Sequence, residues 1–490
     1  MTWPLIVRWC LFALILCSAG GARAQAPDTL WTRTFGGTNI DVGHAVAETR
    51  SGGFVVAGYT RSFGTMGGRN VLLIGTDASG RNEWIRAFGG DADDEGYAVD
   101  QTSDGGLIVA GYTKSFGAGL KDVILIRTDS AGNALWTRTF GGAQDDEGYG
   151  VQQTSDGGYI VGGVTSSYGA GSRDLWLIKT DTMGYEVWKK TAGGLGSDGA
   201  WAVEQTPDGG YAATGWTMSG AAGPLGDMWL VKADTGGNQR WAARFGGSDA
   251  DRGHAMRRTA DGGYIVTGYT SSWGAGLDDL LLVKTDSAGG GGWTKTLGGT
   301  GRDYGRAVEE VPGGGYVIAG YTLSYGAGSE DFWIIRTDQA GNMLWSKTLG
   351  GTASDMAYGL DRTFDGGYVA VGHTLSSGAG VHDVWLVRLA AEATSAGGEP
   401  AIPQRFGLLR SYPNPFNVSC RIAYALPEAG EVEMKVFDLL GREVAVPLKG
   451  RQDAGSHAVD FDGSGLGGGV YLYRLRSGSR TAVGRMVLVK

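Results

Sequence analysis

Cysteine, proline and long apolar runs are scarce in this chain of 490 residues. Of its three cysteines, Cys10 and Cys17 lie in the apolar N-terminal stretch, which excludes an internal disulfide or a cysteine-based metal site in the rest of the chain. The 11 prolines are too few for a collagen triple helix. Beyond the N-terminal stretch, no segment has the roughly 18 consecutive apolar residues that a membrane-spanning helix needs.

Signatures of catalysis and of nucleic-acid binding are also missing. The five histidines show no metal-ligand spacing, and the chain has neither a nucleophile elbow nor a Ser/His/Asp order. The formal net charge is −9 and charges of both signs are interspersed, which argues against nucleic acid or an anionic membrane as partner. The chain therefore fits a binding protein better than an enzyme.

Glycine, in contrast, is abundant, with 90 residues. A disordered glycine-rich linker is excluded, because 42% of the residues are hydrophobic and 16 are tryptophan. Glycine at this level in an apolar, aromatic chain predicts many tight turns between many short strands.

A repeat of 52 or 53 residues organises most of the chain. A Gly-Gly pair follows five residues after each repeated tryptophan, and most units also contain an Asp-Gly-Gly turn. The repeated tryptophans are Trp31, Trp84, Trp136, Trp188, Trp241, Trp293 and Trp345.

Each unit is predicted to contain four antiparallel strands. In the unit at 94–142 they are expected at Gly96–Thr102, Leu107–Thr113, Asp122–Thr128 and Ala134–Phe140, and no stretch has helical periodicity. Sheets that cannot bury both faces alone pack face to face in a β-propeller, whereas a linear solenoid would need polar caps, which are not evident. The sequence predicts an all-β fold with a seven-bladed β-propeller.

The two ends of the repeat array predict how the ring closes. The seventh unit ends at 384–388 without a fourth strand, while an unpaired strand, Thr29–Phe35, precedes the first unit. We therefore expect the N-terminal strand to complete the last blade, which removes exposed sheet edges.

The expected domain order follows from these patterns. Residues 1–24 read as a secretory signal peptide, with Arg8 before the apolar stretch and Ala22-Arg23-Ala24 at the cleavage site. Residues 25–390 form the propeller. Residues 391–409 are an interdomain linker rich in Ala, Gly and Pro, and 410–490 are a small C-terminal β-sandwich.

Two features of the repeats resemble known propellers. The pattern Asp-x-x-Gly-x-x-x-Trp, as in Asp129-Gly132-Trp136, resembles the tryptophan-docking motif of quinoprotein propellers, which implies that each indole packs against a neighbouring blade. Whole units are similar to the β-propeller repeats of secreted bacterial and archaeal proteins. That similarity implies an architecture and no particular reaction.

The last 80 or so residues contain the stretches YPNPFN, VFDLLGREV, AGSHAVDFDGSGLGGGVYLYRL and RMVLVK. They resemble the type A C-terminal sorting domain of the type IX (Por) secretion system, which is related to an Ig-like domain of flagellar hook-cap proteins. The resemblance implies passage through the periplasm to the outer cell surface or the medium, with the secretion machinery as partner. Strands are expected at Cys420–Ala425, Glu431–Asp438, His457–Phe461, Gly469–Leu475 and Arg485–Lys490.

Cys420 has two interpretations, a buried strand residue or a thiol that joins two chains.

One aspartate recurs at the start of the first strand in all seven units, at Asp41, Asp94, Asp146, Asp198, Asp251, Asp303 and Asp355. Either these carboxylates bind a cation, or each accepts hydrogen bonds from its own glycine-rich loop. The sequence predicts no cofactor other than Ca²⁺, which would be present only in the cation-binding interpretation. For Ca²⁺ the best candidates are Asp91, Asp93, Asp94 and Glu95, because hard cations take several oxygen ligands.

Three residues after each repeated aspartate the side chain varies, giving the candidate ligand-binding set His44, Tyr97, Tyr149, Trp201, His254, Arg306 and Tyr358. Aromatic and hydrogen-bonding groups near a channel mouth suit stacking on sugar faces, and the alternative is packing between blades. A second aromatic set is expected on the same face, at Phe63, Phe116, Tyr168, Trp273 and Tyr325.

These observations predict an exported or cell-surface binding or adhesion protein without catalytic activity, whose ligand is a glycan or a surface protein. The alternative is a secreted carbohydrate-active hydrolase or lyase that uses carboxylates and tyrosines on the propeller scaffold.

Overall fold

The computed structural model of the chain describes residues 25–65, 67–392, 406–412, 419–478 and 480–488. All regular elements in these ranges are β-strands, so none is a helix of the length and hydropathy needed to cross a membrane. The predicted signal peptide at 1–24 and most of the predicted linker at 391–409 lie outside the described residues.

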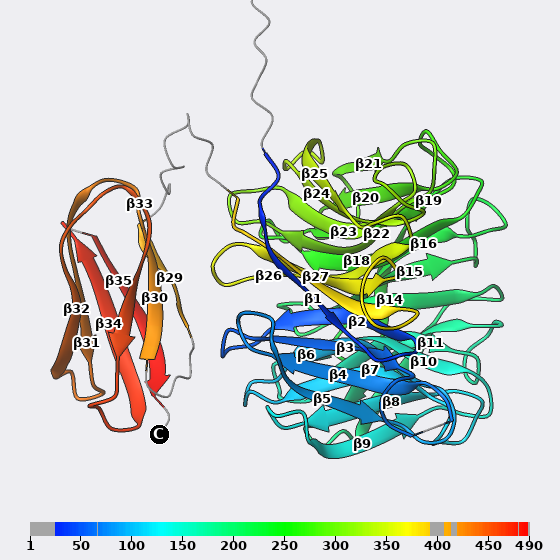
Figure 1. Cartoon of the computed structure of the whole chain (residues 1–490), viewed down its shortest axis with the longest axis horizontal. Coiled ribbons are helices and arrows are strands. Elements are labelled where there is room, and N and C mark those ends of the chain that lie inside the picture. Colours follow the sequence, from blue (N-terminus) through cyan, green and yellow to red (C-terminus); the bar gives the residue numbers. More distant parts are fainter. Residues whose placement is uncertain (1–24, 66, 393–405, 413–418, 479, 489–490) are drawn as a thin grey trace, which may run out of the picture.

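Residues 29–389 form seven four-stranded antiparallel sheets, numbered 1 to 7 here in chain order (Figure 1). The first strands are β2 (Asp41–Glu48), β6 (Asp94–Gln101), β10 (Asp146–Gln153), β14 (Asp198–Gln205), β18 (Asp251–Arg258), β22 (Asp303–Glu310) and β26 (Asp355–Arg362). The second strands are β3 (Phe54–Thr60), β7 (Leu107–Thr113), β11 (Tyr159–Thr165), β15 (Tyr211–Thr217), β19 (Tyr264–Thr270), β23 (Tyr316–Thr322) and β27 (Tyr368–Thr374).

The third and fourth strands complete the sheets. The third strands are β4 (Asn70–Thr76), β8 (Asp122–Thr128), β12 (Asp174–Thr180), β16 (Asp227–Ala233), β20 (Asp279–Thr285), β24 (Asp331–Thr337) and β28 (Asp383–Leu389). The fourth strands of sheets 1 to 6 are β5 (Asn82–Phe88), β9 (Ala134–Phe140), β13 (Glu186–Ala192), β17 (Gln239–Phe245), β21 (Trp293–Leu297) and β25 (Met343–Leu349).

The fourth strand of sheet 7 comes from the other end of the chain. The N-terminal strand β1 (Thr29–Phe35) pairs antiparallel with β28, and the strand order is β1-β28-β27-β26. In Figure 1 the dark blue β1 accordingly lies along the yellow strands of sheet 7. The predicted pairing of the N-terminal strand with the seventh unit is confirmed. Sheet 7 also contacts sheet 1, because β2 lies against β26 and β27.

The core lies between the sheets. The second and third strands are buried along almost their whole length, so their side chains pack on both faces against neighbouring sheets. One cluster, for example, joins Ile74 of sheet 1 to Val371 and Leu386 of sheet 7. Burying a Val, Ile or Leu side chain stabilises the fold by about 1.5–3 kcal/mol, so face-to-face packing supplies most of the stability.

The repeated tryptophans join neighbouring sheets at their outer strands. A Cβ placed on Gly132 would lie 2.5 Å from the indole of Trp84, and Gly132 has φ +75°. Both the contact and the backbone conformation therefore require glycine. Equivalent contacts join Trp31 to Gly80, Trp136 to Gly184, Trp188 to Gly237, Trp241 to Gly289 and Trp293 to Gly341. The indoles pack against the next sheet, as the motif implied.

The repeated aspartates cap their own loops. Asp94 accepts hydrogen bonds from the Gly90 N–H at 2.9 Å, from the Ser115 hydroxyl at 2.7 Å and from the Thr113 hydroxyl. All seven aspartates are fully buried, and each accepts the N–H of the glycine four residues earlier. This geometry matches the loop-capping interpretation.

The C-terminal region forms two further sheets, in the orders β29-β30-β33 and β32-β31-β34-β35. Their strands are β29 (Gly407–Tyr412), β30 (Ser419–Leu426), β31 (Gly430–Phe437), β32 (Glu443–Gln452), β33 (Gly455–Asp462), β34 (Gly469–Ser477) and β35 (Arg480–Leu488). Five of them match predicted strands, whereas β29 and β32 were not predicted. Cys420 is 1% exposed in the core between these sheets, as expected for a buried strand residue.

Candidate ligand-binding site in the central cavity

The first strands of all seven sheets surround a central cavity of about 270 Å³. The pairing of first and second strands is interrupted by a β-bulge in every sheet, between Gly96 and Ala98 in sheet 2, for instance. The residue inside each bulge lines the cavity. These bulge residues are the predicted set, here called the belt: His44, Tyr97, Tyr149, Trp201, His254, Arg306 and Tyr358.

Rings of the belt contact one another around the cavity. The ring centroids of His44 and Tyr97 are 5.0 Å apart, and those of Tyr97 and Tyr149 are 4.8 Å apart. His44 also contacts Tyr358 at 5.2 Å, and Trp201 contacts His254 at 4.6 Å. The structure thus brings all seven predicted residues together, most of them half-buried.

The cavity has two ends. At the loop end, where the first strands begin, two tyrosine hydroxyls of the belt donate to carboxylates: Tyr97 to Glu95 at 2.9 Å and Tyr149 to Glu147 at 2.6 Å. Burial raises the pKa of both tyrosines, with the neighbouring carboxylates adding to the shift. The two hydroxyls therefore stay protonated and remain donors to the carboxylates.

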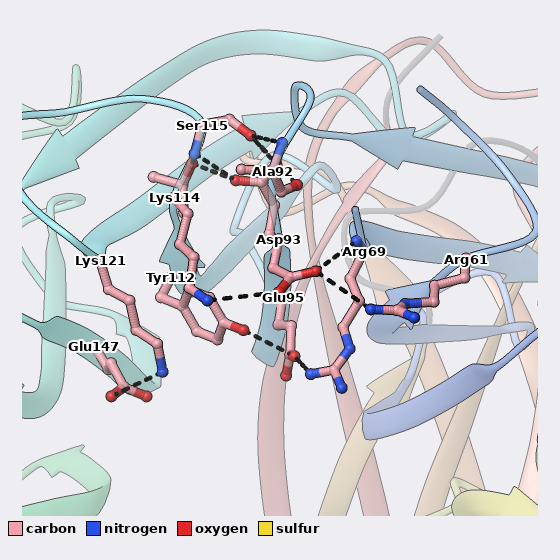
Figure 2. A network of polar contacts seen from close by, with 12 residues as sticks. Arg61, Arg69, Ala92, Asp93, Glu95, Tyr112, Lys114, Ser115, Lys121 and Glu147 are labelled. Atoms are coloured by element: carbon pink, nitrogen blue, oxygen red, sulfur yellow. Dashed lines mark hydrogen bonds and ion pairs between the residues drawn. The ribbon is translucent and has the colours of Figure 1, made fainter. Parts of the chain in front are cut away.

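Cations surround these carboxylates at the loop end (Figure 2). Glu95, 4% exposed, pairs with Arg69 and also accepts the Tyr112 hydroxyl at 2.9 Å. Glu147, 3% exposed, pairs with Lys121 at 3.3 Å and Arg173 at 3.2 Å.

Closer to solvent at the same end, Asp93 lies 3.7 Å from Arg61 and 3.5 Å from Lys114. Figure 2 shows Arg61 and Lys114 on either side of Asp93, and the pair of Lys121 and Glu147 separate from them.

Three of the four predicted calcium ligands accept hydrogen bonds or form ion pairs with protein donors. Asp93 accepts the Arg69 N–H at 3.0 Å, while Asp94 caps its loop and Glu95 belongs to the cation network. Across the described part of the chain, no group of three or more His, Cys, Asp or Glu side chains is arranged to hold a metal ion. Asp93, Asp94 and Glu95 thus bond to separate donors, and calcium binding by this group together with Asp91 stays a prediction.

The second aromatic set lies in the loops that follow the second strands. Four of its members are exposed: Phe116 by 50%, Tyr168 by 37%, Trp273 by 42% and Tyr325 by 44%. Phe63 is half-buried and packs against the core between sheets 7 and 1. The four exposed side chains lie in equivalent loops of sheets 2, 3, 5 and 6.

The hairpin end of the cavity, where first strands turn into second strands, is acidic. Asp100 accepts the Gln153 N–H at 2.9 Å, and Glu204 accepts the Arg258 N–H at 2.9 Å. Asp361 likewise accepts the Glu48 N–H at 2.8 Å. Each bond joins neighbouring sheets, so these carboxylates link sheet to sheet.

A side-chain cation is also present at the hairpin end. Arg257 donates to Glu309 at 2.8 Å, across the contact between sheets 5 and 6. The pKa of Asp361 is raised to about 6, mainly by burial and to a smaller extent by the nearby charge of Glu309.

Comparison with known proteins identifies the C-terminal region. The match to the family of the secretion system C-terminal sorting domain covers residues 410–490. This region is a type IX sorting domain. The protein is therefore secreted or exposed on the outer cell surface, and the sorting domain implies interaction with the secretion machinery.

The chain is also similar to more distantly related proteins. The regulatory protein FlaEY of Caulobacter vibrioides is 28% identical over 207 residues, which cover 37% of this chain and 21% of FlaEY. The chain thus spans about a fifth of that relative's length.

Among solved structures, the Neurospora crassa Pan2 WD40 domain has a TM-score of 0.44 at 11% identity, covering 72% of this chain and 90% of that domain. PorZ, a surface component of the type IX secretion system of Porphyromonas gingivalis, has a TM-score of 0.36 at 12% identity, covering 90% of this chain and 58% of PorZ. Similarities at these scores assign no activity.

The cations of the loop end were not predicted from the sequence. Arg69, Lys121 and Arg173 directly precede the third strands of sheets 1 to 3. The signal that could have revealed them is positional, because sheets 4 to 7 carry Gly226, Asp278, Glu330 and His382 there. A cation that is present at this position in only three of the seven repeats is not needed to form the sheet, which all seven repeats form without exception.

Proposed function

We propose that this protein is an exported, non-catalytic binding protein. Its seven sheets are the blades of a β-propeller at 25–390, which the N-terminal strand closes. A linker at 391–409 joins it to an Ig-like sandwich at 410–490. The contact of sheet 7 with sheet 1 and the docking of Trp31 on Gly80 support closure.

The ligand is a glycan that binds at the loop end of the cavity. The observation that carries this proposal is the belt, which combines half-buried aromatic faces with polar groups in one concave site. Aromatic faces stack on the apolar faces of sugars, while tyrosine, histidine and arginine hydrogen-bond to hydroxyls. The exposed aromatics of the surrounding loops extend this surface outward.

Catalysis fits this site less well. A hydrolase or lyase needs a carboxylate with room to exchange a proton with substrate. Glu95 accepts from Arg69, Tyr97 and Tyr112, and Glu147 accepts from Tyr149, Lys121 and Arg173. Both carboxylates are occupied by protein donors, so they position side chains.

The test is calorimetric titration of the purified chain with a panel of oligosaccharides, alongside an assay for sugar release. We expect binding without turnover, weakened about tenfold by Trp201→Leu, which removes an indole that lines the cavity. Tyr185→Ser is the matched control, because Tyr185 is an aromatic residue 59% exposed on the turn before β13. Release of sugar would contradict this proposal and favour the alternative function, a carbohydrate-active hydrolase or lyase.

A further inference from the structure

We propose that Arg306 binds a carboxylate group of the ligand, so that the glycan is an acidic one, with carboxylated sugar units. This inference rests on the proposed function and names its ligand class. It is carried by a cation that lines the cavity without an anionic partner, in a belt that is otherwise aromatic.

Arg306 forms no ion pair with any carboxylate of the described residues. The buried cations of the repeats differ, because each pairs with a carboxylate. Those pairs are Arg127 with Asp104, Lys179 with Asp156, Lys232 with Asp208, Lys284 with Asp261, Arg336 with Glu392 and Arg388 with Asp365. A half-buried charge without a counter-ion is costly, and an anionic ligand removes that cost.

The hydrogen-bonding capacity of Arg306 is also not used up. One terminal nitrogen contacts His254 Nε2 at 3.1 Å and the other donates to the Tyr321 hydroxyl at 3.1 Å. The Nε–H of Arg306 is buried without a hydrogen-bond partner in the described structure. The guanidinium lies within 5.8 Å of the ring centroids of Tyr304, Tyr321 and Tyr358, which hold it in place.

Arg306 is the one charged side chain of the belt near neutral pH. Burial lowers the pKa of His44 to about 4 and that of His254 well below its usual value. His254 Nδ1 lies 2.8 Å from the Gly305 carbonyl, so Nδ1 carries the proton and Nε2 accepts from Arg306. An anion in the cavity is therefore attracted to Arg306.

The loop end admits an anion better than the hairpin end does. At the loop end, Arg69 pairs with Glu95, Lys121 and Arg173 pair with Glu147, and Arg302 pairs with Asp278 at 3.2 Å. At the hairpin end, Asp100, Glu204 and Asp361 accept backbone N–H groups, and Arg257 pairs with Glu309. An acidic ligand therefore approaches Arg306 from the loop end, past the exposed aromatics.

The size of the cavity limits how many sugar units of the ligand can enter it. A volume of about 270 Å³ lies just below the roughly 300–1,000 Å³ of ligand pockets. The cavity therefore accepts one sugar unit or a chain end, with its carboxylate on Arg306, and the rest of the chain lies over the loops.

The experiment compares oligogalacturonate with the neutral galactose oligomer of equal length, by calorimetric titration of the full chain. Arg306→Tyr places at this position the residue found in sheets 2, 3 and 7, so it suits the belt. Arg306→Lys keeps the charge, and Arg240→Gln removes a charge on β17 that is 66% exposed outside the cavity.

We expect the acidic oligomer to bind about tenfold to a hundredfold more tightly than the neutral one. Arg306→Tyr removes that difference, Arg306→Lys retains part of it, and Arg240→Gln leaves it unchanged. Equal binding of both oligomers, unaffected by Arg306→Tyr, would overturn this inference while the proposed glycan binding stands.

Two further arms separate other sources of the carboxylate. In one outcome, succinate raises the melting temperature of the native chain but not of Arg306→Tyr, while neither oligomer binds. That result would support a carboxylate site at Arg306 and contradict a glycan as the ligand. If neither oligomer binds and polyglutamate binds in an Arg306-dependent way, the ligand is an acidic protein and the acidic glycan is overturned.

Discussion

The two ends of the central cavity use the same residue types for different purposes. At the loop end, Glu95 and Glu147 accept from tyrosine hydroxyls and side-chain cations. At the hairpin end, Asp100, Glu204 and Asp361 accept backbone N–H groups of the next sheet. Carboxylates bonded to backbone hold sheets together, whereas carboxylates bonded to side chains orient the groups that line the cavity.

The two ends also differ in how regularly their contacts repeat from sheet to sheet. The hairpin end repeats one bond type around much of the cavity, which also includes Gln152 accepting the Gln205 N–H at 2.6 Å. The loop end is uneven, with cations on sheets 1 to 3 and exposed aromatics on sheets 2, 3, 5 and 6. The proposed function assigns ligand binding to the loop end, where the side chains differ from sheet to sheet.

The largest effect is expected from removing the strand that completes sheet 7. Deletion of residues 25–37 exposes the edge of β28 and removes the contact of Trp31 with Gly80. If the ring is closed, both ends of the cavity lose their shape and the chain no longer unfolds cooperatively in differential scanning calorimetry. An unchanged melting curve would refute closure.

The next prediction compares the repeated aspartates with the carboxylates of the hairpin end. Asp94→Ala removes the acceptor of three hydrogen bonds, from Gly90, Thr113 and Ser115, and should lower the free energy of unfolding by about 3 kcal/mol. Asp100→Ala removes the acceptor of one sheet-to-sheet bond and should cost about 1 kcal/mol. Urea denaturation measures both, and equal losses would contradict the ranking.

The two ends should also respond to pH in opposite directions. Asp361 at the hairpin end has its pKa raised from 3.8 to about 6 by burial and by Glu309. The folded state holds this proton more tightly than the unfolded state, so stability falls as pH rises from about 4 to 6. In the belt, burial lowers the pKa of His44 from 6.5 to about 4, so stability rises as pH rises from about 4 to 6.5.

Two variants separate these opposing terms. Asp361→Asn removes the group that makes stability fall as pH rises. The melting temperature of this variant should therefore rise more steeply between pH 4 and 6 than that of the native chain. His44→Gln removes the group that makes stability rise with pH. The melting temperature of this variant should therefore rise less steeply over the same range than that of the native chain. Thermal scans across this range provide the measurement, and parallel curves for both variants would contradict the assignment.

The smallest effect concerns the belt hydroxyls. Tyr97→Phe removes a donor to Glu95 and should cost about 1 kcal/mol of stability. Tyr358→Phe is the matched control, because its hydroxyl contacts the Met356 sulfur at 3.3 Å, a weak acceptor. Urea denaturation of the two variants should rank Tyr97→Phe as the more damaging, and the reverse order would remove Glu95 from the positioning network.

Much of the fold could be predicted because the repeats make the same local choices seven times. The strands at 107–113, 122–128 and 134–140 were predicted with the bounds that β7, β8 and β9 have. For the first strand, the range expected from composition began two residues late, at Gly96, whereas the recurrent aspartate marked its start correctly, since Asp94 pairs with Thr113. In the sorting domain β32 was missed, because Pro447 and Gly450 interrupt its pattern.

The candidate site was only partly predictable. The belt followed from its fixed distance to the repeated aspartate, since a bulge recurs at that place in every sheet. Its partners did not follow, because Arg69 meets Glu95 and Lys121 meets Glu147 between neighbouring sheets. Such pairs depend on how two sheets pack, which no local sequence pattern encodes.

The pairing of β1 with β28 has a consequence for how this protein is made. Residues 29–35 are synthesised some 350 residues before their partners at 384–389. A contact with so large a sequence separation forms late, because its loop-closure entropy must be offset by structure already in place. The N-terminal strand therefore completes its sheet as one of the last steps of folding, after the array of repeats has been synthesised.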